Sequence, residues 1–168
     1  MFGLTDLGIV HTLISLVALV SGAVALIRDH EISPRQRLGR LYIWTTVLTC
    51  LTAFGIFQHG GFGKPHALGV ITLIVLAIAW LAGRGLFGRL AAYVETVSYS
   101  LTFFFHIVPA LTETFTRLPA GAPVFSGPDD PTLQKLLGLC FLIFLVGATL
   151  QVRRLRAQGP SAAGLRGA

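Results

Sequence analysis

Charged side chains are scarce in this sequence. Asp, Glu, Lys and Arg make up 12% of its 168 residues, whereas 54% of the residues are hydrophobic. Soluble domains carry about 25% charged residues, so the composition argues against a water-soluble globular protein. The net charge is +6, but the basic residues form no patch interleaved with aromatic residues. We therefore exclude nucleic acid as the partner that explains the positive charge.

Cysteines and catalytic motifs are also scarce. The two cysteines, Cys50 and Cys140, fall inside apolar runs, where a thiol behaves as a small hydrophobic group. They therefore say nothing about the redox compartment. The chain has no H-E-x-x-H, no C-x-x-C and no nucleophile elbow. A G-x-G-x-x-G match at residues 83–88 follows an apolar helix and not a strand, which argues against dinucleotide binding.

Long apolar runs, in contrast, fill most of the chain. A helix needs about 20 apolar residues to cross a bilayer, within a range of about 17–25. Five segments meet this requirement: Leu7–Ile27, Leu41–Phe57, Ala67–Gly83, Ala92–Leu111 and Leu136–Val152. The sequence therefore predicts an all-α membrane bundle of five transmembrane helices over residues 1–156. Residues 157–168 are rich in Gly, Ala and Ser and are expected to form a disordered cytoplasmic tail.

Basic residues are distributed unevenly between the two sides of this predicted bundle. Ten lie after the first, third and fifth spans, and three lie on the opposite side: Lys64, Arg117 and Lys135. The positive-inside rule then predicts an N-terminus outside and a C-terminus in the cytoplasm. Arg outnumbers Lys 11 to 2 and Asn is absent, which suggests a GC-rich bacterial genome. We therefore expect the bacterial inner membrane as the location.

Aromatic residues near the predicted inner surface of the membrane support this topology. Trp and Tyr are enriched at both membrane–water interfaces. Four such residues fall near the predicted inner interface, and we expect them to form an aromatic belt: Tyr42, Trp44, Trp80 and Tyr93.

Four of the five histidines are predicted to gather at the outer side. At 1.5 Å per residue, His11 lies roughly 6 Å deep in the first span and His106 roughly 7–8 Å deep in the fourth. His59 closes the second span and His66 opens the third. Ionisable side chains within a membrane are costly and usually functional, so this histidine cluster is a candidate site.

Helical spacing places small and polar residues on the same faces as these histidines. The first span carries Ser15, Ala18, Gly22 and Ala25 in line with His11. The fourth carries Glu95, Ser98, Thr102, Pro109 and Glu113 in line with His106, and the second carries Thr45, Thr49 and Thr52. Small and polar stripes are typical of helix–helix interfaces in lipid. We expect the three stripes to face one another.

One function compatible with this pattern is cofactor binding. His11 and His106, with His66 as a replacement, would ligate a b-type haem axially. The same three histidines with Glu113 would instead hold Zn²⁺ or Cu²⁺. A haem would make the chain an electron-transfer protein, with a quinone or another redox protein as its partner.

Two other functions remain open. In a proton-linked transporter, a relay would run through Glu95, Thr102, His106 and Glu113. Such a chain would need to form a homo-oligomer, because the sequence shows no inverted repeat. In a non-catalytic accessory or assembly subunit, the polar stripes would serve only helix packing.

Short motifs in the first half of the chain carry a family resemblance. His11 heads the first span with Gly22 on its stripe, Arg37-Leu38-Gly39-Arg40-Leu41-Tyr42 enters the second, and His66 opens the third. In these features, roughly the first 85 residues resemble a family of small bacterial membrane proteins grouped as a domain of unknown function. The resemblance implies a multi-pass membrane protein and no particular reaction.

Overall fold

The computed structural model describes residues 6–56 and 62–158, and its regular structure is helical throughout these residues. Five helices follow one another along the chain: α1 (Asp6–Asp29), α2 (Arg37–Ala53), α3 (Lys64–Gly83), α4 (Ala91–Arg117) and α5 (Pro131–Ala157). A short 3-10 turn, η1 (Gly88–Leu90), precedes α4. The all-α prediction is confirmed. His59 and most of the predicted tail lie outside the described residues.

Four of the helices are long and apolar enough to cross a membrane, namely α1, α3, α4 together with η1, and α5. The chain is therefore a multi-pass membrane protein. The segment predicted as the second span, Leu41–Phe57, overlaps α2, which has 17 residues. Helix α2 begins earlier than the predicted span, at Arg37. It ends at Ala53, because the next residues form a turn in which the Gly55 amide donates to the Thr52 carbonyl.

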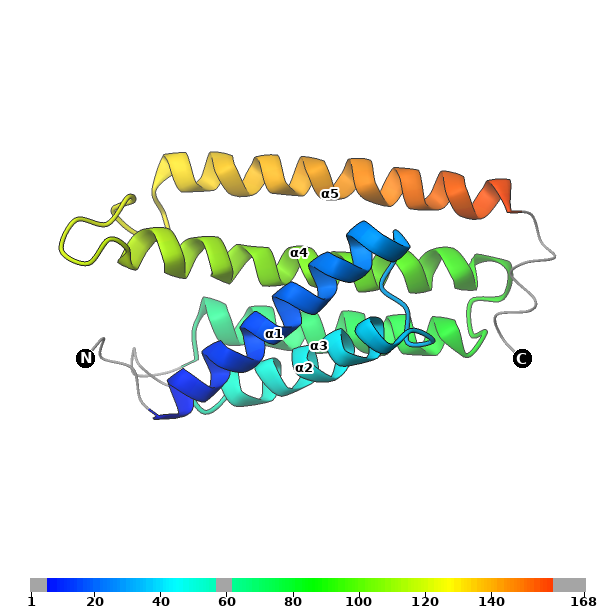
Figure 1. Cartoon of the computed structure of the whole chain (residues 1–168), viewed down its shortest axis with the longest axis horizontal. Helices are drawn as coiled ribbons and strands as arrows, with labels where there is room; N and C mark the ends of the chain where they lie inside the picture. The colour runs from blue at the N-terminus through cyan, green and yellow to red at the C-terminus, as the bar shows by residue number, and fades with distance from the viewer. Residues whose placement is uncertain (1–5, 57–61, 159–168) are drawn as a thin grey trace.

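The helices form a four-helix core with a fifth helix at its side (Figure 1). Helix α1 packs on α2 and crosses the bundle obliquely, while α3 packs on α4. Helix α5 packs along α4 and makes few contacts with the other helices. The buried hydrophobic cluster accordingly lies among α1 to α4 and the loop between α1 and α2. It contains Ala18, Ala25, Ile32, Tyr42, Leu76, Ala79 and Tyr99.

Two glycines allow the close packing at this core. A Cβ added at Gly22 would lie 2.7 Å from the rings of both Phe103 and Tyr42. A Cβ at Gly39 would lie 2.0 Å from the Ser33 carbonyl oxygen in the loop between α1 and α2. Gly22 is buried, as the stripe on the first span predicts. Small residues thus bring the backbones of this core together, as is common between membrane helices.

One member of the predicted aromatic belt does not lie on the surface of the bundle. Trp44 and Trp80 are exposed on the bundle surface, but Tyr42 is fully buried. Its position on the inner face of α2 directs the side chain toward α4, where the hydroxyl finds a hydrogen-bond partner in Thr102. A buried Tyr usually needs such a partner, and Tyr42 is therefore a core residue.

Candidate functional site

The inner face of α4 carries most of the buried polar side chains that the sequence singled out. Glu95, Thr102 and His106 are all buried, so the prediction that they share an inward face is confirmed. Pro109 is exposed on the bundle surface. Glu113 is also largely exposed and forms an ion pair with Arg117 one turn later, at the end of α4. The buried part of the predicted stripe therefore ends near His106.

Two hydrogen bonds join this face of α4 to α2. The Thr102 hydroxyl donates to the Tyr99 carbonyl at 2.7 Å, so it accepts the bond that links it to the Tyr42 hydroxyl at 2.8 Å. One turn farther along, a 3.0 Å bond connects His106 Nε2 and Thr46 Oγ1. Thr46 does not belong to the predicted Thr45, Thr49 and Thr52 stripe.

His11 also bonds to α2, at a different threonine. Its Nδ1 lies 2.9 Å from Thr52 Oγ1. Because the Thr52 hydroxyl donates to backbone carbonyls of its own helix, the imidazole must be the donor. The His11 Nε2 then carries the lone pair. Imidazoles that ligate metals commonly donate through their other nitrogen in this way.

His66 has a local structural role at the beginning of α3. Its Nδ1 accepts a hydrogen bond from the Gly63 amide at 3.2 Å, which satisfies one of the amides left open at a helix start. The ring also packs on Phe62, with 5.4 Å between the ring centroids. These contacts make His66 a cap of α3.

The predicted ligand sets are therefore only partly brought together. Electrostatic interactions connect His11 with both His106 and Glu113, so these three groups lie toward the same end of the bundle. Over residues 6–56 and 62–158, no three His, Cys, Asp or Glu side chains are arranged to hold a metal ion. Haem or metal binding by His11, His66 and His106 stays a prediction.

Glu95 lies at the opposite end of the same face and is held by an arginine. Arg35, in the loop between α1 and α2, donates to both carboxylate oxygens at 3.0 and 3.2 Å. Such a bidentate pair fixes orientation as well as charge. Glu95 thus attaches this loop to α4, and the proton-relay role predicted for it also stays a prediction.

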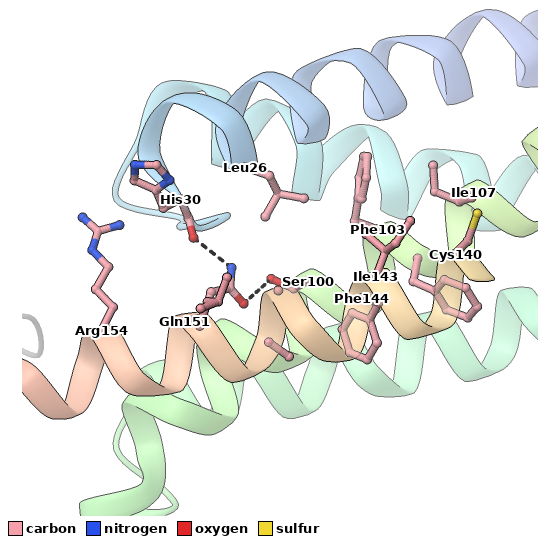
Figure 2. A pocket seen from close by; sticks show the side chains of 14 residues that line it. Leu26, His30, Ser100, Phe103, Ile107, Cys140, Ile143, Phe144, Gln151 and Arg154 are labelled. Atoms are coloured by element: carbon pink, nitrogen blue, oxygen red, sulfur yellow. Dashed lines mark hydrogen bonds between the residues drawn. The ribbon is translucent and has the colours of Figure 1, made fainter. Parts of the chain in front are cut away.

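A cleft of about 750 Å³ lies between α1, α4 and α5. Apolar side chains form most of its wall, and Figure 2 shows them along α4 and α5. The apolar part consists of Leu26, Phe103, Phe104, Ile107, Cys140, Ile143, Phe144, Gly147, Ala148 and Leu150. Small-molecule sites in proteins span about 300–1,000 Å³ and are mostly apolar with a few polar groups. This cleft matches that description.

The polar groups of the cleft are gathered at one end. Gln151 Oε1 accepts from the Ser100 hydroxyl at 2.9 Å, and its Nε2 donates to the His30 carbonyl at 2.9 Å (Figure 2). Arg154 donates to the Asp29 carbonyl at 3.0 Å. His30 adopts a positive φ of 62° directly after α1, the left-handed conformation in which many helices end.

Sequence reasoning missed this cleft because it depends on three helices that are distant along the chain. His30 is the one histidine outside the predicted cluster of four, yet its side chain lines the cleft (Figure 2). One signal was available: Gln151 is the only strongly polar side chain within the predicted span Leu136–Val152 besides Thr149. None of His11, His66 and His106 lines the cleft.

Comparisons with family models, with curated proteins and with solved structures found no match to this chain.

Proposed function

We propose that the protein binds a membrane amphiphile, with its apolar chain in the cleft between α1, α4 and α5. The observation that carries this proposal is the combination of a long apolar wall with a cluster of hydrogen-bonding groups at one end. A molecule with an apolar chain and a polar head matches both parts. The protein is then an amphiphile-binding or accessory protein of the membrane.

The surfaces beside the cleft support a ligand that comes from the bilayer. Ile27 on α1 is 78% exposed, and Leu142 and Val146 on α5 are about 60% exposed. Apolar side chains of this kind face hydrocarbon in a membrane protein, because lipid replaces water as their solvent. An amphiphile already dissolved in the bilayer would therefore reach the cleft without crossing water.

The proposal includes a bacterial inner-membrane location and five spans, with the N-terminus outside. The start of α1 and the end of α5 lie at opposite ends of the bundle (Figure 1), as an odd number of crossings requires. The asymmetry of basic residues supports the cytoplasmic side for the end of α5. In this orientation the polar end of the cleft faces the inner leaflet.

Two glycines on α5 provide a matched test of the cleft. Gly147 lines it, Gly138 does not, and a Cβ at either position would meet no atom within 4 Å. The two are nine residues apart and therefore lie on opposite faces of the helix. We expect Gly147→Leu to reduce the lipid retained by the purified protein, measured by native mass spectrometry, by about tenfold, whereas Gly138→Leu leaves it unchanged.

The outcomes of this comparison are distinct. A loss confined to Gly147→Leu supports a ligand within the cleft. Equal retention in both variants and the unmodified chain would place the lipid elsewhere and overturn the proposal. An optical spectrum of the same sample, oxidised and then reduced, tests the separate prediction of a haem held by His11 and His106.

A further inference from the structure

We infer that the amphiphile is an anionic glycerophospholipid whose phosphate binds at Arg154. This inference rests on the proposed function, because it assumes that the apolar chain occupies the cleft. It adds the identity of the head group and the side chain that recognises it. The structural basis is the unequal distribution of charge at the polar end of the cleft.

Arg154 is the cation that this end of the cleft presents. Its side chain is directed from α5 toward the loop that holds His30 (Figure 2). The guanidinium donates to the Asp29 backbone carbonyl at 3.0 Å, and in the described part of the chain no carboxylate lies within ion-pair distance of it. A guanidinium has five N–H donors, so most of its hydrogen-bonding capacity is available to a ligand.

The carboxylates near this end are already engaged or lie outside the cleft. Arg28 donates to both oxygens of Asp29 at 2.9 Å, which satisfies that carboxylate. Glu31 follows His30 in the chain but does not line the cleft. Arg153 and Arg156 belong to the same helix but do not line the cleft, so Arg154 is the arginine that faces a ligand there. The surroundings therefore favour an anionic head group.

The chemistry of phosphate fits the groups available here. Arginine matches phosphate geometry through two parallel N–H donors. Gln151 lines the same end of the cleft, and its Nε2 donates one of two hydrogens to the His30 carbonyl. The second hydrogen would contact an ester oxygen of the lipid. The acyl chain would then follow Phe103, Ile107 and Phe144 along the apolar wall. Basic residues at the cytoplasmic end of a membrane helix commonly attract anionic lipids.

Phosphatidylglycerol and phosphatidylcholine with identical acyl chains separate head-group recognition from chain binding. We expect the delipidated protein to retain phosphatidylglycerol in preference to phosphatidylcholine, as measured by native mass spectrometry at fixed ionic strength. Arg154→Gln should reduce this preference about fivefold, the effect of one basic residue near a membrane surface. Arg154→Lys keeps the charge and should retain most of the preference.

Arg153→Gln is the matched control. It removes the same charge at the neighbouring residue, and the Arg153 side chain does not line the cleft. An unchanged preference in Arg153→Gln together with a loss in Arg154→Gln supports the inference. Equal losses in both variants would indicate general surface attraction and overturn it. If Gly147→Leu lowers retention of both lipids but no preference exists, the head-group inference fails and the proposed function stands.

Discussion

The four-helix core and helix α5 are built in different ways. A third of the residues in the most apolar stretch of α3 is buried within the protein, and the same share holds for η1 with α4. In α5 the buried share is only 6%. Polar side chains connect the core helices at several levels, from Arg35 and Glu95 to His11 and Thr52. The contacts between α5 and α4 include aromatic rings, with Phe104 packed against Phe141 and Phe144.

The difference shows how this fold combines a fixed part with an open one. In lipid no hydrophobic force drives helices together, so close backbone packing and interhelical hydrogen bonds must do so. The core has both of these features. Helix α5 has few of them, and the space it leaves beside α1 is the cleft. Its polar bonds to the rest of the protein at that end come from Gln151 and Arg154.

The largest expected difference between the two regions comes from the same substitution made in each. Gly39→Ala would place a Cβ 2.0 Å from a backbone oxygen, whereas the Cβ of Gly147→Ala would meet no atom within 4 Å. Overpacking of this kind costs about 1–3 kcal/mol. We expect a clear fall in thermal stability in detergent for Gly39→Ala and almost none for Gly147→Ala. Similar stabilities for the two would mean that the core is not closely packed at this loop.

A smaller effect is expected at the end of the core where Arg35 binds Glu95. Glu95→Gln removes the charge that Arg35 holds, and the Arg35 side chain is 38% exposed while that of Glu95 is 10% exposed. Breaking a buried pair costs about 3–5 kcal/mol and an exposed pair about 0.2–1 kcal/mol. We expect about 1–2 kcal/mol of unfolding free energy, measured in a double-mutant cycle with Arg35→Gln. Additive single effects would show that the two side chains do not interact.

The smallest effect concerns the start of α5 and depends on pH. Hydrogen bonds from the Thr132 amide and then from Ser126 hold the pKa of the Asp130 carboxyl below its usual value. The carboxylate therefore stabilises the first turn above the unfolded pKa of about 3.9, and this contribution is lost as pH falls through the lower folded pKa. We expect several-fold faster hydrogen exchange in this turn for Asp130→Ala at neutral pH.

Asp130→Asn provides the control for that prediction. Asparagine caps helices as well as aspartate does but does not titrate. We expect Asp130→Asn to keep slow exchange at neutral pH and to lose the change on acidification. Acid sensitivity that survives in Asp130→Asn would point to another titrating group.

Several features of the fold follow from patterns within single segments. The cap of α5 is one of them: Asp130 stands directly before Pro131, the first residue of the helix, and accepts from the Thr132 amide at 2.8 Å. The burial of Gly22, Thr102 and His106 follows from helical spacing. The partners of these residues were less predictable, because they depend on how each helix is rotated against its neighbour. Thr46 contacts His106 although it is not on the predicted stripe of the second span.

The sequence by itself determined the helices, the membrane as their surroundings, and which faces turn inward. These properties depend on apolar length, spacing and capping, all of which are local. The tertiary structure alone decided that α5 lies at the side of the core, that His11 and His106 bond to separate threonines of α2, and that Arg154 and Gln151 meet the end of α1. Such contacts depend on the tilt and rotation of whole helices, and many arrangements of the same amphipathic segments would bury their small and polar faces equally well.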